Sequence, residues 1–132
     1  MNKKNNFKEL ESQSPPPTGR DLGGLNSKGF RIAFKMQLFA GKKEEYQKRH
    51  DEIWPELVEL LKQTGISEYS IFLDEATYSL FGVLKAEDPA ALNDLPAHPV
   101  MQKWWKYMGD IMESNPDNSP VSIPLPEVFY LP

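Results

Sequence analysis

The feature of this chain that most constrains its fold is a change of apolar period near its first third. From Lys42 to Thr64 apolar residues recur about every 3.6 positions, the period of a helix, and Gly65 ends the run. Before it, residues 30–39 alternate as a strand does, with one face formed by Ile32, Phe34, Met36 and Leu38 and the other by Ala33, Lys35, Gln37 and Phe39. A strand followed at once by a helix predicts a mixed fold.

The predicted helix is interrupted by Pro55, which cannot donate to the carbonyl four residues back. We therefore expect a kink or a break near Glu52 to Trp54. One broad stripe of the helical run carries Tyr46, His50, Ile53, Trp54, Leu57, Leu60 and Leu61.

The remaining elements follow from the same two periods. Residues 69–73 and 78–84 alternate, and the short link Asp74 to Thr77 predicts that they form a hairpin. A short helical piece follows Pro89, and a longer helix is predicted from about Pro99 to Met112. Turn residues crowd 115–120, and the prolines at 124 and 126 restrict 121–131 to an edge strand or an irregular extended segment.

The order strand, helix, strand, strand, helix, strand predicts an α+β fold of the ferredoxin-like, split βαβ kind, with a four-stranded antiparallel sheet and both helices on one face. Residues 30–132 would form this single domain. Residues 1–29, with three consecutive prolines and a glycine pair, are predicted to be a flexible N-terminal tail.

The other face of the sheet is predicted to be apolar in part, because Phe39, Phe72, Phe81 and Val83 fall on its alternate positions. Monomers rarely expose a contiguous patch of this kind. We therefore expect a two-fold homodimer, a dimeric α+β barrel in which two four-stranded sheets pack together.

Composition excludes several classes of function. The net charge of −4 and the absence of a basic stripe argue against nucleic acid as a partner. The chain has no cysteine, which excludes disulfides, thiol nucleophiles and thiolate metal sites. No apolar run is long enough to span a membrane, and no signal peptide is apparent, so a cytoplasmic location is expected.

Tyr46 and His50 are the strongest candidates for chemistry, because residues four apart on a helix lie on one face. A histidine can give and accept a proton near neutral pH. The residues alone leave open a structural role, since a lone helical histidine is often a surface or core residue. His98, beside Pro96 and Pro99, is expected at a helix entry.

Trp104 and Trp105 are adjacent, so on a helix they project about 100° apart and only one is expected at the centre of a narrow core stripe. The other could stack on a sugar or lie at a dimer interface. Tyr69 opens the second strand and could reach a polar cavity or belong to the rim of the core. The sequence contains no Gly-rich phosphate loop and no metal-ligand spacing, so neither metal nor cofactor is expected.

Three segments carry a resemblance to a known family. EEYQKRHDEIWPEL (44–57), QKWWKYM (102–108), and NPDNSPV (115–121) with EVFYLP (127–132) closely resemble the L-rhamnose mutarotase family. The likeness covers nearly all of residues 31–132, whereas residues 1–29 have no counterpart in it.

The resemblance implies a dimeric α+β barrel that interconverts the α and β anomers of L-rhamnose without metal or cofactor. It implies His50 as proton donor, with Tyr46, Tyr69, Trp104 and Trp105 contacting the sugar. Two alternatives stay open: a cofactor-free monooxygenase, since some share this barrel, and a non-catalytic dimeric binding protein. The preference among L-rhamnose and related sugars, and the identity of the general base, are not determined by the sequence.

Overall fold

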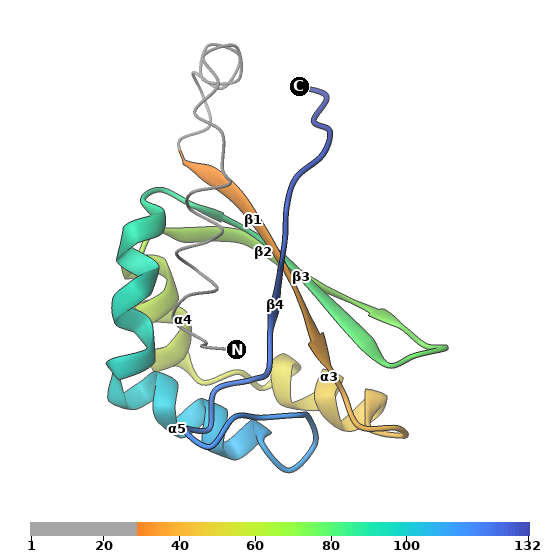
Figure 1. The fold of residues 1–132 in the computed structure, drawn as a ribbon. Helices are drawn as coiled ribbons and strands as arrows, with labels where there is room; N and C mark the ends of the chain where they lie inside the picture. The colour runs from red at the N-terminus through yellow and green to blue at the C-terminus, as the bar shows by residue number, and fades with distance from the viewer. Residues whose placement is uncertain (1–28) are drawn as a thin grey trace.

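The computed structural model describes residues 29–132, so the predicted tail lies, apart from Gly29, outside the described residues and the domain boundary stays a prediction. The predicted order of elements is confirmed (Figure 1). The elements are β1 (Phe30–Gln37), α3 (Lys43–Asp51), α4 (Pro55–Gln63), β2 (Ile66–Asp74), β3 (Ser79–Ala86), the 3-10 helix η1 (Pro89–Ala97), α5 (Pro99–Met108) and β4 (Ile123–Leu125).

The strands form a four-stranded antiparallel sheet in the order β2-β3-β1-β4. Strand β3 thus lies between β1 and β2, which is the arrangement of a split βαβ unit. Strand β4 is short and, among residues 29–132, pairs only with β1, placing Pro124 opposite Phe34. An edge position tolerates a proline that cannot donate to the ladder, so the predicted edge strand is confirmed.

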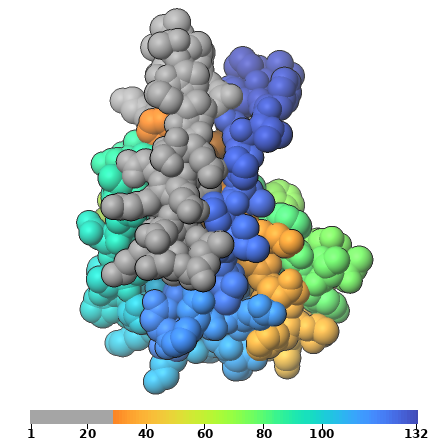
Figure 2. Space-filling model, in the orientation of Figure 1, coloured from red at the N-terminus to blue at the C-terminus, as the bar shows by residue number. Residues whose placement is uncertain are grey.

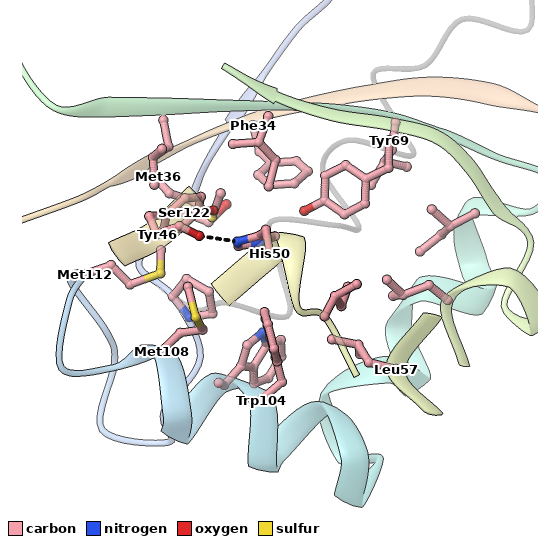
Figure 3. Close-up of a pocket in the computed structure, with 18 of the residues that line it drawn as sticks. Phe34, Met36, Tyr46, His50, Leu57, Tyr69, Trp104, Met108, Met112 and Ser122 are labelled. Atoms are coloured by element: carbon pink, nitrogen blue, oxygen red, sulfur yellow. Dashed lines mark hydrogen bonds between the residues drawn. The ribbon is translucent and has the colours of Figure 1, made fainter. Parts of the chain in front are cut away.

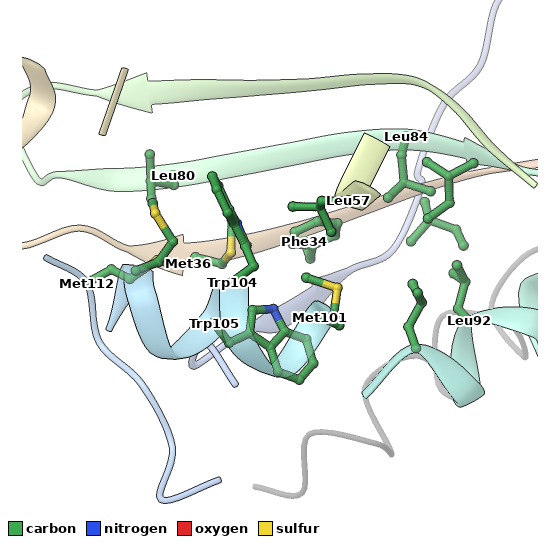
Figure 4. Packing of buried hydrophobic residues seen from close by; sticks show 14 of the residues in the cluster. Phe34, Met36, Leu57, Leu80, Leu84, Leu92, Met101, Trp104, Trp105 and Met112 are labelled. Atoms are coloured by element: carbon green, nitrogen blue, oxygen red, sulfur yellow. The ribbon is translucent and has the colours of Figure 1, made fainter. Parts of the chain in front are cut away.

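The helices cover one face of the sheet (Figure 1). The residues that point toward them are the alternate ones predicted for β1, namely Ile32, Phe34 and Met36, which are 2–6% exposed. Leu80, Leu84 and Ala86 of β3 continue this layer. They meet Leu57 of α4, Leu92 of η1, and Met101 and Trp104 of α5 (Figure 4). The core therefore lies between the sheet and the three elements α4, η1 and α5.

The predicted break in the first helical run is confirmed. Helix α3 ends at Asp51, Trp54 has extended backbone angles (φ −65°, ψ 133°), and Pro55 begins α4. Proline is well accommodated at the first position of a helix, where its missing N–H has no intrahelical partner. The break separates the residues that the sequence placed on one stripe, and it lets α3 take a different direction from α4.

The second predicted helix is shorter than expected. Helix α5 ends at Met108 with Gly109 as its cap, four residues before the predicted end at Met112. Met112 instead forms an isolated bridge with Leu38, just beyond the end of β1. Apolar spacing near the end of a helix does not distinguish another helical turn from a buried loop, and here the chain turns to reach the sheet.

A bulge in β2 changes which side chains face the helices. Ile66 pairs with Ala86, whereas Ser70 pairs with Val83, so the register shifts between Ser67 and Ser70. Glu68 takes up the shift with a positive φ of 49°. Since a shift of one residue reverses the face of every following side chain, both Ile66 and Tyr69 point toward the helices.

The opposite face of the sheet and the end of the chain expose apolar side chains. Phe72 and Phe81 are directly opposite each other on this outer face, and Phe72 is 62% exposed. After β4 the chain leaves the body of the molecule (Figure 2), and Val128, Phe129 and Leu131 are at least 75% exposed. No helix among residues 29–132 is long and apolar enough to cross a membrane.

Candidate functional site

A pocket of about 690 Å³ lies between the sheet and the helices. This volume falls within the range typical of small-molecule sites. Every site residue expected from the sequence borders it: Tyr46, His50, Tyr69, Trp104 and Trp105. The close-up shows His50 and the Tyr69 hydroxyl near the middle of the pocket, with Trp104 beneath them and Phe34 and Met36 above (Figure 3).

Helix α3 brings Tyr46 and His50 together as the spacing predicted. Their ring centroids are 4.4 Å apart. The Nδ1 atom of His50 lies 3.1 Å from the backbone carbonyl oxygen of Tyr46. A carbonyl oxygen only accepts, so Nδ1 carries a proton and donates it, and in the neutral ring Nε2 is left as an acceptor. The local helix geometry thus selects the tautomer of the imidazole.

Burial shifts the pKa of each of these groups. Loss of solvent lowers the pKa of His50 below its ordinary value of 6.5, although the Tyr46 carbonyl and the charge of Asp51 act in the opposite direction. Burial also raises the pKa of Tyr46 and that of Tyr69, so both phenols are protonated at neutral pH. The pocket therefore holds a neutral imidazole beside hydroxyl groups that can donate hydrogen bonds.

Helix α5 supplies the floor of the pocket. Trp104 contacts His50 edge to face, with ring centroids 5.4 Å apart, and it also packs edge to face on Trp54. The expectation that only one of the two tryptophans could lie in the core stripe is wrong, because Trp104 is 6% and Trp105 8% exposed. Both are buried because α5 is covered over a broad face that also includes Met101 and Met108.

Tyr69 reaches the pocket because of the bulge in β2. The residue is 39% exposed, yet its hydroxyl lies inside the pocket (Figure 3). It does not open the strand, as the sequence suggested, because β2 begins three residues earlier at Ile66. Bulges commonly redirect a side chain beside a functional site, and this one adds a phenol to the imidazole and phenol of α3.

Several pocket residues were not predicted as site residues. Phe34 was assigned to the inner face of β1, but its ring lies over Gly82, where a Cβ atom would come within 2.6 Å of it. The ring of Phe34 also contacts Tyr69 at a centroid distance of 6.2 Å. The signal in the sequence that could have identified Phe34 as a pocket residue was Gly82, which lies opposite it on β3. Other unpredicted members of the lining include Met36, Met101, Met108, Met112 and Ser122.

The second histidine has a structural place. His98 is the N-cap of α5, and its Nδ1 accepts a hydrogen bond from the backbone N–H of Val100 at 3.2 Å. This confirms its predicted position at a helix entry. Within residues 29–132 no group of three or more His, Cys, Asp or Glu side chains is arranged to hold a metal ion.

A family profile, two relatives and a solved structure agree on one family. A profile of the L-rhamnose mutarotase family matches residues 31–131. L-rhamnose mutarotases from Agrobacterium fabrum and Brucella anthropi are 63% and 57% identical to the chain, over 76% and 79% of its length and 94% and 98% of theirs. A crystal structure of the L-rhamnose mutarotase from Formosa agariphila superposes with a TM-score of 0.73 at 55% identity, covering 77% of this chain and 98% of that one.

The family profile covers the three segments in which the sequence resembled the family, except Pro132, and it covers every residue that lines the pocket. The chain belongs to the L-rhamnose mutarotase family.

Proposed function

We propose that this chain is an isomerase that interconverts the α and β anomers of L-rhamnopyranose, with His50 as the group that moves the proton. The observation that carries the assignment of His50 is its position: a neutral, largely enclosed imidazole whose Nε2 is free to accept a proton, beside two phenols and a tryptophan. The assignment of L-rhamnose as the sugar rests on the relatives named above.

The reaction breaks and re-forms one bond, from C1 to the ring oxygen, and moves protons between the two oxygens bound to C1. The hydroxyl group on C1 loses a proton while the ring oxygen gains one, so the bond from C1 to the ring oxygen breaks and an open-chain aldehyde forms. Rotation about the C1–C2 bond and closure on the other face of the carbonyl give the second anomer, and the protons return in reverse. The net reaction consumes no proton and transfers no electron.

The resting state of His50 favours the role of proton acceptor in the ring-opening step. Its Nδ1 proton is held by the Tyr46 carbonyl, so Nε2 is the nitrogen that can take the C1 hydroxyl proton. The imidazolium formed in this step is the proton donor that the family resemblance implied, and it acts on the ring oxygen or, in the reverse direction, on the aldehyde. One histidine thus serves both directions, as a reversible reaction requires.

The surrounding residues have the properties of sugar contacts. Tyr46 and Tyr69 offer hydroxyls to a ligand that carries several of its own, while Trp104 and Trp105 offer flat apolar surface to the C–H groups of a pyranose. The apolar lining also suits the C6 methyl group of a 6-deoxy sugar, which water solvates poorly. The preference for L-rhamnose over close relatives rests on this lining.

Saturation-transfer NMR on L-rhamnose tests the proposal. Wild-type protein should exchange magnetisation between the two anomers, and His50→Gln should reduce the rate by about 10² to 10⁴. His98→Gln is the matched control, because that histidine caps α5 and lies outside the pocket. Full exchange by His50→Gln would place the proton transfer elsewhere. Binding of L-rhamnose without any exchange by the wild type would favour a binding protein.

We also propose that two copies pack through the outer faces of their sheets into a dimeric barrel. This face carries Phe72, Phe81 and Val83, and on the edge strand Ile123, which is 46% exposed. A solvent-facing patch of this extent is typical of an interface. Light scattering should give a mass near twice 15.1 kDa. Phe72→Glu should shift the protein to the monomer, and a wild-type monomer would exclude the dimer. The cytoplasmic location stays a prediction.

A further inference from the structure

Helix α3 carries the proposed proton-transfer residue but has little contact with the core. It is nine residues long, and none of its side chains is buried. Isolated helices of this length are marginal in water, and most helices are stabilised by packing an apolar face. The partly buried ring of Tyr46 is the part of α3 that packs against the core, so the orientation of His50 also depends on other contacts.

Arg49 supplies the largest set of such contacts. It precedes His50 in the last turn of α3, and its side chain is only 10% exposed. Its Nε donates to Glu45 at 2.8 Å, and Nη1 donates to the backbone carbonyl of Tyr107 at 2.6 Å. Nη1 and Nη2 donate to the two carboxylate oxygens of Asp110 at 2.9 and 3.2 Å. A bidentate pair of this kind fixes direction as well as distance.

The guanidinium also touches the aromatic cluster behind His50. It lies 4.3 Å from the ring centroid of Tyr107, and that ring contacts Trp104 and stacks on Trp54. Trp104 in turn contacts His50. Arg49 thus joins the last turn of α3 to the end of α5 on one side, while His50 and Trp104 meet in the pocket on the other.

We propose that Arg49, held by Asp110, is the positioning residue that fixes the imidazole of His50 against Trp104. This inference rests on the proposed function, because it concerns the same site. Adjacent residues on a helix point about 100° apart, so Arg49 can bind α5 without entering the pocket. It is absent from the lining of the pocket, so it acts through His50 and does not touch the sugar.

The other end of α3 offers a contrasting contact. Lys43, the first residue of α3, forms a 2.6 Å ion pair with Glu75 in the β2–β3 turn, but the two side chains are 45% and 69% exposed. Exposed ion pairs contribute little to structure. Replacing the nearly buried Arg49 instead disrupts four hydrogen bonds at once. Glu75 lies outside the pocket lining, so Glu75→Gln is a matched control for loss of an ion pair on the same helix.

The test compares Arg49→Lys and Asp110→Asn with that control in the full chain. Arg49→Lys keeps the charge but loses the planar fork. Asp110→Asn removes the charge at a side chain that is 67% exposed, so it should fold. Each should lower the kcat of anomer exchange by about tenfold, below the roughly hundredfold that a displacement of 1 Å can cost. KM should change by less than about twofold, and the double variant should be no slower than Arg49→Lys.

NMR titration of the His50 ring provides a readout that does not depend on activity. Loss of the anchor should expose the imidazole and move its titration midpoint up toward the ordinary value, whereas Glu75→Gln should leave it unchanged. If Arg49→Lys and Asp110→Asn lower only the melting temperature and keep the wild-type kcat and His50 titration, Arg49 is merely structural. A failure of the proposed function is distinct, because then the wild type would not exchange anomers or His50→Gln would retain exchange.

Discussion

Helices α3 and α5 both line the pocket, but different forces hold them. Helix α5 buries Met101, Trp104, Trp105 and Met108 in the core. Helix α3 buries no side chain and is attached by ion pairs at its two ends and by the partly buried ring of Tyr46. The site therefore combines a rigid apolar floor with a polar helix that carries the groups for proton transfer.

The difference teaches how one small domain separates the residues that stabilise the fold from those that serve the sugar site. A residue of the core can be replaced only at a cost in stability, because it is closely packed against its neighbours. No residue of α3 is fully buried, so a side chain of α3 that faces the pocket can be chosen for its acid–base properties. Substitutions on α5 should therefore act mainly on stability and those on α3 mainly on activity.

The largest effect is expected from Trp104→Ala on α5. Removing this buried indole leaves a cavity between Trp54, His50 and the sheet, and should lower the free energy of unfolding by about 3–5 kcal/mol. Urea denaturation followed by circular dichroism measures it. Lys103→Ala, an exposed position on the same helix, is the control and should change the stability by less than about 0.5 kcal/mol. Equally small effects of the two substitutions would show that the buried face of α5 does not stabilise the fold.

A smaller effect, on sugar affinity and not on stability, is expected from Tyr46→Phe on α3. The ring and its contact with His50 remain, so the melting temperature should stay near that of the wild type. The lost hydroxyl should weaken L-rhamnose binding by roughly five- to tenfold, the equivalent of about one hydrogen bond. Titration calorimetry in the His50→Gln background measures binding without turnover. Unchanged affinity combined with lower stability would reverse the proposed division between the two helices.

A third expectation concerns the effect of pH on stability and activity through His50 of α3. Because burial lowers the pKa of His50, the unfolded chain binds a proton at mildly acid pH that the folded chain does not. The free energy of unfolding should therefore fall as the pH drops below 6.5, down to the folded pKa, and should be insensitive to this group above that range. The exchange rate should fall as His50 becomes protonated.

Comparison with His50→Gln isolates this contribution. Urea unfolding at pH 7.5 and pH 5 should show a smaller loss of stability for His50→Gln than for the wild type, since glutamine does not titrate. Identical losses in the two proteins would mean that the folded imidazole titrates as it does in water.

The smallest expected effect concerns the strand that brings Tyr69 to the same pocket. Glu68 has a positive φ, which is costly for any residue with a Cβ atom. Glu68→Gly should relieve this cost while losing the 3.3 Å ion pair with Lys85, for a net gain of no more than about 1 kcal/mol. Differential scanning calorimetry should show a small rise in melting temperature, and sugar affinity should stay the same. A lower affinity would show that Glu68 itself contributes to the site.

Most of the fold and the identity of the candidate site residues could be predicted from the sequence. Alternation in residues 30–38 placed Ile32, Phe34 and Met36 on the inner face, and Pro55 placed the helix break. The spacing of Tyr46 and His50 predicted their contact. The burial of both Trp104 and Trp105 could not be predicted, because the width of a buried helix face depends on how many elements pack against it.

The sequence by itself determined the elements, their order and the pairing of tyrosine with histidine, because these depend on residues close together along the chain. Only the tertiary structure decided the tautomer and enclosure of His50, the direction of Tyr69 and the joining of Arg49 to Asp110, which are 61 positions apart. The reason is physical: desolvation, strand register and bidentate geometry depend on which surfaces meet, and local propensity carries no information about that.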